Sequence, residues 1–183
     1  MSCPWVILDR DGVINHDSEA FITRPEQWVP IPGSIEAMAA LSRSGWQVAV
    51  ATNQSGLARG LLDEPMLEAI HDRLRAAVAA AGGRIDALAY CPHGPDSGCR
   101  CRKPAPGLYE ALAERLGLSL EGVPVVGDSA RDLEAAVAVG GRPILVRTGK
   151  GERTLEEGRL PEGAWVEPDL ASAVRSLLKE DTA

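Results

Sequence analysis

The chain has 183 residues, which is enough for one sizeable hydrophobic core but short for two ordinary domains. Its composition, 45% hydrophobic and 25% charged with a net charge of -7, suits a globular protein and disfavours one that binds the nucleic-acid backbone. No apolar run approaches the roughly 18 residues that a membrane span needs, and the first residues lack the features of a secretory signal. We therefore expect one domain over residues 1–183, a cytoplasmic location, and neither a nucleic-acid nor a membrane partner.

Short apolar runs alternate along the chain with segments of helical spacing. The runs have the length of buried strands and lie at 5–8, 46–51, 84–90, 123–126 and 142–146. The helical segments lie at 33–44, 64–81, 105–117, 129–139 and 169–179. This alternation predicts an α/β fold with a Rossmann-like parallel sheet, helices on both faces and right-handed crossovers. Residues 15–32 are expected to form a long loop, and 148–168 an irregular segment with one helical turn.

Polar residues follow four of the predicted strands, in the segments 9–12, 52–56, 91–101 and 127–129. In open parallel sheets, ligands bind outside the carboxyl ends of the strands. We therefore expect these four segments, which are far apart in the sequence, to meet at one edge of the sheet.

Three aspartates, Asp9, Asp11 and Asp128, belong to these segments. The pair Asp9 and Asp11 is weak evidence of a site by itself, because carboxylates at strand ends are common. Three acids gathered at one edge would repel one another unless a cation neutralised them. Mg²⁺ prefers oxygen ligands, keeps several waters and can clamp a phosphate. The three aspartates therefore predict a Mg²⁺ site.

The third segment, which we call the zinc loop, spans residues 91–101. It offers three thiolates and one imidazole, from Cys91, His93, Cys99 and Cys101. Four protein ligands complete a tetrahedral Zn²⁺ shell, so the ion is expected to be structural and to hold Arg102 and Lys103 beside the active edge. The alternative is a cluster of reduced thiols without metal. Cys3 lies outside the pattern and is expected to be a small buried residue.

The segments LDRDGVIN, TNQSG, RKPAPG and VGDSARD resemble, in this order, four motifs of the haloacid-dehalogenase-type phosphatases. The resemblance implies that Asp9 attacks phosphorus and that Asp11 serves first as acid and then as base. It also implies Mg²⁺ bound by Asp9, the backbone carbonyl of Asp11 and Asp128. Thr52 would bind the phosphoryl group, and Lys103 would stabilise charge in the transition state. Without the other motifs, Thr52 would be an ordinary turn residue and Lys103 a solvated side chain.

Within that superfamily, DRDGVIN, TNQSGLARG and the zinc loop ending in CRKP are similar to the heptose-bisphosphate phosphatases of lipopolysaccharide and S-layer sugar synthesis. This likeness implies a fold without a separate cap domain and removal of the 7-phosphate from a heptose 1,7-bisphosphate. Arg102 would recognise the remote part of this small phosphorylated sugar, since a guanidinium pairs phosphate oxygens bidentately. The full set of implied substrate contacts is Asp17, Asn53, Gln54, Ser55 and Arg102. Nothing demands a dimer, so a monomer is expected.

Three rival functions remain open from the sequence. Histidinol-phosphate phosphatase shares the catalytic motifs and a similar zinc loop, and it would differ only beyond the phosphate. A phosphatase acting on nucleic-acid 3′-phosphate ends would require a basic groove, which an acidic chain disfavours. From another class, the zinc loop could belong to a binding module with incidental aspartates, but such modules bring flanking basic residues. Phosphate release from an aryl phosphate with Mg²⁺ would exclude a binding module.

Overall fold

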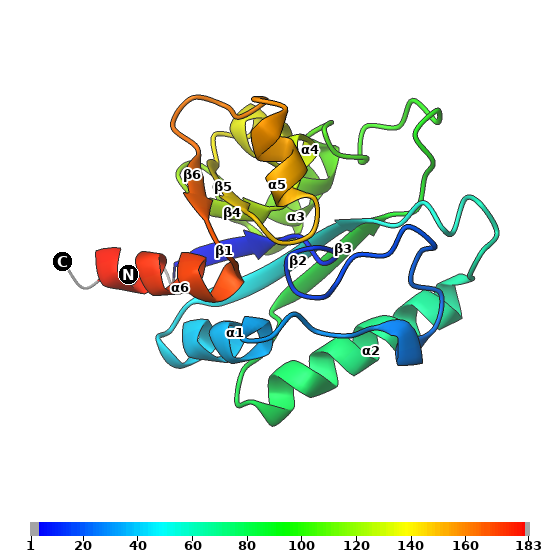
Figure 1. Ribbon diagram of the computed structural model, residues 1–183, viewed down its shortest axis with the longest axis horizontal. Coiled ribbons are helices and arrows are strands. Elements are labelled where there is room, and N and C mark those ends of the chain that lie inside the picture. Colours follow the sequence, from blue (N-terminus) through cyan, green and yellow to red (C-terminus); the bar gives the residue numbers. More distant parts are fainter. Residues whose placement is uncertain (1–3, 182–183) are drawn as a thin grey trace.

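The computed structural model describes residues 4–181, so the expectation for Cys3 lies outside the described residues (Figure 1). Its strands form one six-stranded sheet, and all neighbouring strands are parallel, in the order β3-β2-β1-β4-β5-β6. The strands are β1 (Trp5–Leu8), β2 (Gln47–Asn53), β3 (Ala87–Cys91), β4 (Pro124–Gly127), β5 (Arg142–Val146) and β6 (Trp165–Glu167). The predicted parallel α/β fold is confirmed.

Helices cover both faces of the sheet, because both faces of the strands are apolar. Successive side chains of a strand point to opposite faces. Val48 and Val50 accordingly pack into one core cluster, and Ala49 and Ala51 into the other. The first cluster lies under α1 (Ser34–Arg43), α2 (Glu64–Ala80) and α6 (Leu170–Glu180). The second lies under α3 (Gly107–Leu116) and α4 (Ala130–Ala138), on the opposite side of the sheet in Figure 1. Among the described residues, no helix is both long and apolar enough to cross a membrane.

The strand order reverses between β1 and β4, and this point of the sheet carries the site. After β1, the chain adds β2 and β3 on one side of β1. It then adds β4, β5 and β6 on the other side. Leu8 pairs with Val126, and the backbone N–H of Asp9 donates to the Val126 carbonyl at 2.9 Å. Residues that follow these two strands, Asp9 and Asp128, are therefore neighbours at a topological switch point, where ligands of such sheets bind.

The loop between β1 and α1 is packed against the core, and it contains a short 3₁₀ turn, η1 (Pro25–Gln27). Trp28 and Ile22 belong to the first core cluster. The Ser34 hydroxyl and the Ile31 N–H both donate to the Ile14 carbonyl, at 2.5 and 2.9 Å. The predicted loop is thus present, and its packing fixes the residues that directly follow Asp11.

Two parts of the sheet differ from the sequence prediction. Residues 148–168 contain α5 (Gly151–Glu156) where a helical turn was predicted, but they also contain the edge strand β6, which the prediction of an otherwise irregular segment missed. Three residues are too few to display the alternation that marks a strand. Strand β3 begins at Ala87 and not at residue 84, because Asp86 ends the ladder: its carboxylate accepts from the Val48 N–H at 2.8 Å.

Truncation of Leu74, a fully buried residue of α2, should destabilise the fold. We expect Leu74→Ala to lower the free energy of unfolding by about 2–5 kcal/mol, because it removes buried apolar surface and leaves a cavity. The matched control is Leu61→Ala, since Leu61 is 48% exposed and its loss should cost no more than about 0.5 kcal/mol. Urea denaturation monitored by circular dichroism measures both, and equal losses would contradict the assigned core.

Candidate active site

A cavity of about 500 Å³ opens at the carboxyl edge of the sheet, at the switch point. It brings together residues from β1, β2, the segment after the zinc loop and the segment after β4. All the residues predicted to be catalytic or to contact substrate line it, together with the predicted Mg²⁺ ligand of the fourth segment: Asp9, Asp11, Asp17, Thr52, Asn53, Gln54, Ser55, Arg102, Lys103 and Asp128. The expected convergence of separate segments is therefore present.

The carboxylates of Asp9, Asp128 and Asp132 form a compact cluster, with one oxygen of each within 4.8 Å of the others. Burial and the charges of neighbouring aspartates raise the pKa of Asp9 to about 7, despite the opposing charge of Lys103. Burial, Asp132 and Asp9 likewise raise the pKa of Asp128 to about 8. Oxygen donors with surplus negative charge are what Mg²⁺ selects. The donor set of this cluster therefore fits Mg²⁺.

Two glycines allow the backbone to close around Asp128. Gly12 follows β1 and Gly149 follows β5, and both have positive φ values, +82° and +58°. A Cβ at either position would collide with Asp128 Oδ2. The same oxygen accepts from the Lys150 N–H at 2.8 Å, and the Thr148 hydroxyl donates to the Gly12 carbonyl at 2.7 Å. The loop after β5 thus fixes the orientation of Asp128.

Lys103 is the buried cation of the site. Its Nζ lies 3.0 Å from Asp9 Oδ1 and 2.6 Å from Asp132 Oδ1, and it donates to the Ala51 carbonyl at 2.9 Å. Burial alone would lower the pKa of Lys103, but the charges of Asp132 and Asp9 raise it well above its usual value. Asn53 holds this segment against β2, since its side chain exchanges hydrogen bonds with the Lys103 backbone at 3.1 and 3.2 Å. Lys103 is therefore a fixed positive charge beside Asp9.

The Asp11 side chain lies outside the carboxylate cluster and has its own hydrogen-bonding partners. Burial would raise the pKa of Asp11, but the charge and hydrogen bonds of Arg10, with hydrogen bonds from Asn15 and Gln54, lower it overall. Gln54 Nε2 is 2.9 Å from Asp11 Oδ2 and also 2.9 Å from the buried Thr52 hydroxyl. Gln54 thus links the segment after β2 to the segment after β1.

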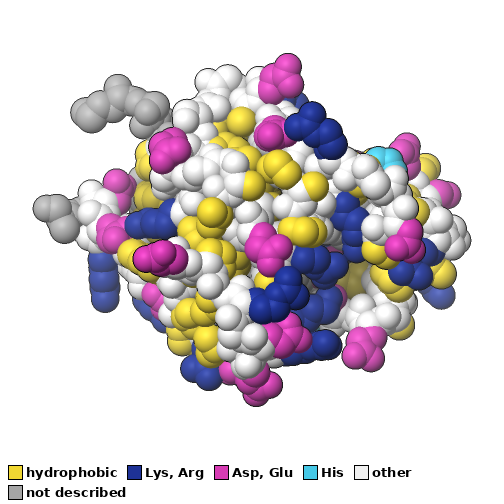
Figure 2. All heavy atoms as spheres, turned by 90° about the horizontal axis from the view of Figure 1, so that it is seen from above, with side chains coloured by type: hydrophobic (Ala, Val, Ile, Leu, Met, Phe, Trp, Pro, Cys, Tyr) yellow, Lys and Arg dark blue, Asp and Glu magenta, His cyan; other side chains and the backbone are white. Residues whose placement is uncertain are grey.

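Basic side chains line the outer part of the pocket. Arg102 is joined there by Arg59, Arg131 and Lys150. Lys and Arg side chains gather on the right half of the face shown in Figure 2. This is the side toward which β1 points in Figure 1. Burial and the charges of Arg131 and Arg59 lower the pKa of Arg102. Lys150 Nζ forms an ion pair with Asp17 at 2.8 Å. Although the chain is acidic overall, the outer part of the pocket carries these four basic side chains, which suit an anionic ligand.

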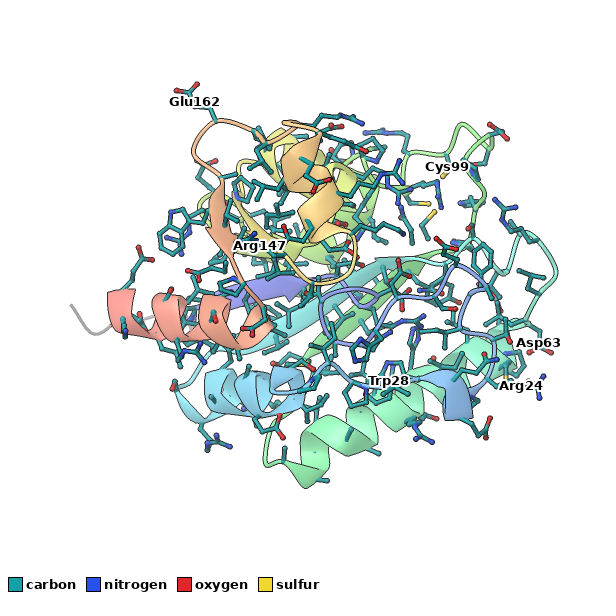
Figure 3. The ribbon with its side chains drawn as sticks, viewed as in Figure 1. Arg24, Trp28, Asp63, Cys99, Arg147 and Glu162 are labelled. Carbon is teal, nitrogen blue, oxygen red and sulfur yellow. The ribbon has the colours of Figure 1, made fainter. Side chains whose placement is uncertain are left out.

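The four predicted zinc ligands converge, as Figure 3 shows at Cys99, where a second sulfur atom lies close by. The Sγ of Cys91 is 3.8 Å from that of Cys99 and 3.2 Å from that of Cys101, so these are not disulfides. His93 Nδ1 is 3.6 Å from Cys91 Sγ. A tetrahedral zinc ion with Zn–S bonds of about 2.3 Å separates its sulfur ligands by about 3.8 Å. The spacing and the donor set therefore fit a closed zinc site.

Sequence reasoning assigned no role to Asp132, Arg10 or Lys150. Asp132 belongs to the motif VGDSARD, and it accepts from both the backbone and the hydroxyl of Ser129 at the start of α4. Arg10 stands between the two motif aspartates. Lys150 follows the fifth strand, so the rule that placed the other segments at the carboxyl edge would have found it.

The fold and this site define a haloacid-dehalogenase-like hydrolase: a parallel sheet with clustered carboxylates and a buried lysine at its switch point. A family model described as "HAD-hyrolase-like" matches residues 100–173. This stretch begins in the zinc loop and includes Lys103, Asp128 and Asp132.

Close relatives and a solved structure narrow the class. A Pseudomonas putida protein named D-glycero-beta-D-manno-heptose-1,7-bisphosphate 7-phosphatase is 61% identical, covering 94% of this chain and 98% of its own. The Bordetella bronchiseptica protein of that name is 55% identical, with coverages of 96% and 98%. A crystal structure of D,D-heptose 1.7-bisphosphate phosphatase from B. bronchiseptica, complexed with magnesium and phosphate, has a TM-score of 0.95 at 54% identity and covers 97% of this chain and 99% of that chain.

This chain therefore belongs to the heptose-bisphosphate phosphatase family of the haloacid-dehalogenase-like hydrolases. It is a phosphoric monoester hydrolase, so the alternative of a zinc-containing binding module is wrong.

Replacement of one zinc ligand tests the metal assignment of the zinc loop. We expect Cys99→Ser to lower the bound zinc below one ion per chain and to lower the melting temperature by about 5 °C or more, because metal binding supplies folding free energy. The control is Asp96→Asn, an exposed residue of the same loop, which should retain its zinc. Elemental analysis and thermal denaturation measure the two effects, and unchanged zinc in Cys99→Ser would contradict a structural zinc site.

Binding of Mg²⁺ near neutral pH should release protons. The raised pKa values of Asp9 and Asp128, about 7 and 8, mean that these carboxyls hold protons at lower pH that the cation must displace. The apparent Mg²⁺ affinity should therefore rise from pH 6 to pH 8. Calorimetric titration in buffers of different ionisation enthalpy counts the released protons, and an affinity independent of pH would show that the carboxylate cluster is not the binding site.

Proposed function

We propose that this protein removes the 7-phosphate of D-glycero-β-D-manno-heptose 1,7-bisphosphate and leaves the 1-phosphate in place. The observation that carries the proposal is the cluster of Asp9, Asp128 and Asp132 around Lys103, at the base of a pocket with a basic outer part. Family membership supports the substrate, and the names of the relatives favour the β anomer, which the sequence by itself left open.

Asp9 is the proposed nucleophile. Lys103 holds Asp9 Oδ1 at 3.0 Å, which fixes the carboxylate at the end of β1. An Asp9 oxygen attacks phosphorus, the bond from phosphorus to the sugar oxygen breaks, and an aspartyl-phosphate forms. Water then attacks that phosphorus, the bond from phosphorus to the Asp9 oxygen breaks, and inorganic phosphate and the free Asp9 carboxylate are released. A carboxylate nucleophile thereby divides one difficult displacement into two easier ones.

Asp11 is the proposed acid and base. It gives a proton to the departing sugar oxygen in the first step and takes one from the attacking water in the second. Because its pKa is lowered without substrate, Asp11 takes up the first proton when the negatively charged phosphate binds beside it and raises that pKa. Of its two oxygens, Oδ2 contacts the pocket residue Gln54, whereas Oδ1 contacts the fully buried Asn15. Oδ2 is therefore the oxygen on the pocket side and the one that exchanges the proton.

Positive charge and hydrogen-bond donors stabilise the phosphoryl group. Mg²⁺ held by Asp9, the backbone carbonyl of Asp11 and Asp128 supplies charge neutralisation at the phosphate oxygens. The ammonium of Lys103 lies beside Asp9 and neutralises developing charge from the other side. The Thr52 side chain lines the pocket, and its hydroxyl donates a hydrogen bond to a phosphoryl oxygen.

The outer pocket contacts the sugar and its remaining phosphate. Arg102 is held by the zinc loop, where its guanidinium donates to the His93 carbonyl at 3.1 Å, and it is assigned to the 1-phosphate. Asp17 and Ser55 line the same space and are assigned to sugar hydroxyls. Histidinol phosphate has no second phosphate to use this basic region, so the region favours a bisphosphate. A single domain, a monomer and a cytoplasmic location stay predictions from the sequence.

Loss of the nucleophile should abolish turnover. We expect Asp9→Asn to lower kcat for the β-anomer bisphosphate by about a thousandfold or more, because a carboxamide is a poor nucleophile toward phosphorus. The control is Asp96→Asn, which makes the same chemical change at an exposed residue that does not line the pocket and should keep the parental rate. Phosphate release with Mg²⁺ present measures both, and near-parental activity of Asp9→Asn would contradict the assignment.

A further inference from the structure

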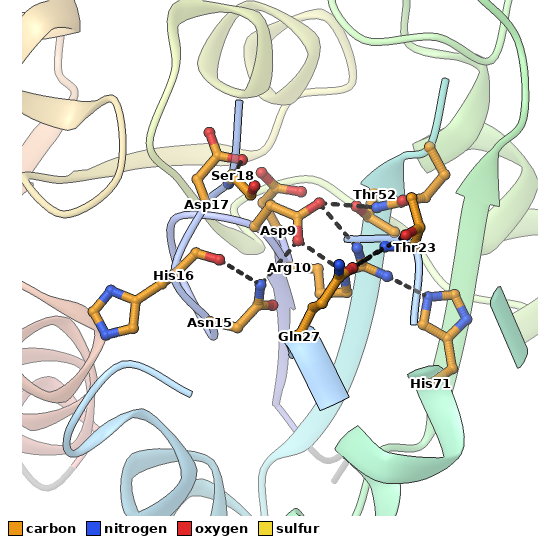
Figure 4. A network of polar contacts seen from close by, with 12 residues as sticks. Asp9, Arg10, Asn15, His16, Asp17, Ser18, Thr23, Gln27, Thr52 and His71 are labelled. Carbon is orange, nitrogen blue, oxygen red and sulfur yellow. Dashed lines mark hydrogen bonds and ion pairs between the residues drawn. The ribbon is translucent and has the colours of Figure 1, made fainter. Parts of the chain in front are cut away.

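His71 is a buried histidine that the proposed mechanism does not use. It belongs to α2 and is fully buried, and its Nε2 lies 3.2 Å from an Arg10 nitrogen, NH1. Figure 4 shows its ring pointing from the helix toward Arg10. Within residues 4–181, His71 Nδ1 has no hydrogen-bond partner, and the nearest carboxylate oxygen of an ion pair, on Glu68, is 4.0 Å away. Helix α2, which packs on the first core cluster, therefore contacts Arg10, the residue between Asp9 and Asp11.

The charge state of His71 determines which kind of interaction it makes with Arg10. Burial, together with the charges of Arg10 and Arg75, lowers the pKa of His71 to about 3, against a smaller opposing effect of Asp11. The imidazole is therefore neutral at physiological pH. Because Arg10 has only donors, His71 Nε2 is the acceptor and its proton is on Nδ1. His71 thus offers Arg10 a hydrogen bond without adding charge.

Arg10 connects His71 to Asp11. The guanidinium is fully buried and contacts both carboxylate oxygens of Asp11, from Nε at 3.0 Å and from NH2 at 3.2 Å. A guanidinium is planar, with its donors in a fixed fork. The contact of NH1 with His71 therefore restrains the same plane that presents the other two nitrogens to Asp11.

The two sides of the Asp11 carboxylate then differ in rigidity. Arg10 and the fully buried Asn15 hold it from the protein side. On the pocket side, Oδ2 contacts Gln54, a residue that lines the cavity and is proposed to meet substrate. Substrate can replace the Gln54 contact, but it cannot reach Arg10 in the protein interior.

We propose that His71 is a positioning residue, which acts through Arg10 to hold the Asp11 carboxylate with Oδ2 facing the leaving oxygen of the substrate. This inference rests on the proposed function, in which Asp11 protonates that oxygen. A role in packing alone is the competing explanation, since His71 also lies against the ring of Tyr90, with 6.0 Å between ring centroids.

The leaving group separates the two explanations. A sugar alkoxide requires a proton to depart, whereas the phenolate of 4-nitrophenyl phosphate departs without one. The value of kcat/KM reports on the first step, the transfer to Asp9. We expect His71→Leu to lower kcat/KM for the heptose bisphosphate about tenfold or more, with a change of less than about threefold for 4-nitrophenyl phosphate. His71→Gln, whose amide oxygen can accept from Arg10, should restore the ratio of the two values to within about threefold of the parent.

Two controls make the test decisive. Leu74→Ala removes buried packing one turn away on α2 without touching Arg10, so it should lower stability and leave the ratio unchanged. If His71→Leu fails to fold, His71→Asn takes its place, because its shorter side chain does not reach Arg10. An equal loss on both substrates, or an unchanged ratio, would overturn the positioning role.

The proposed function can be disproved independently of the positioning role of His71. If the parent enzyme releases no phosphate from the heptose bisphosphate, the substrate proposal is wrong, and the ratio is measured with histidinol phosphate, which also has an alkoxide leaving group. Asp11→Asn supplies the reference for a lost acid. If Asp11→Asn loses sugar-phosphate turnover selectively and the His71 variants do not, the function stands and only the positioning role of His71 is wrong.

Discussion

The ion pairs of Lys103 with Asp9 and Asp132 are the interaction on which the active edge depends. Three clustered carboxylates cannot share a buried space without positive charge, and Lys103 supplies one unit of it. Together with burial, which is the larger cause, the remaining surplus raises the pKa values of Asp9 and Asp128. It also creates the requirement for a divalent cation. The same balance of charges thus links the stability of the site to its chemistry, because the groups that repel one another are the groups that bind Mg²⁺ and attack phosphorus.

Remote parts of the chain serve to hold these groups in place. The zinc loop ends at Cys101, directly before Arg102 and Lys103, so one metal site delivers the residue assigned to the distal phosphate and the lysine beside the nucleophile. Asn53 ties the Lys103 backbone to β2, and the glycine turn at Gly149 brings the loop after β5 onto Asp128. Each support comes from a different strand end, as expected where ligands bind at a topological switch point.

Much of this arrangement could be predicted from the sequence, because its signals are local. Apolar runs marked five strands, and polar residues at their ends marked the site. Contacts between segments that are far apart in the sequence were harder to predict. His71 is an ordinary polar position within an amphipathic helix until the fold places it against Arg10. Edge strand β6 is only three residues long, too short for a periodic pattern, and Asp86 shortens β3 through a side-chain contact that composition does not reveal.

The most direct test of the central claim compares kcat/KM for Mg²⁺-dependent phosphate release from both anomers of heptose 1,7-bisphosphate and from histidinol phosphate, on one enzyme preparation. We expect a preference of about a hundredfold or more for the β-anomer bisphosphate, roughly 2.7 kcal/mol of transition-state discrimination. Faster turnover of histidinol phosphate would contradict it: the carboxylate cluster and Lys103 would keep their roles, whereas the assignment of the basic outer pocket to a second phosphate would be wrong.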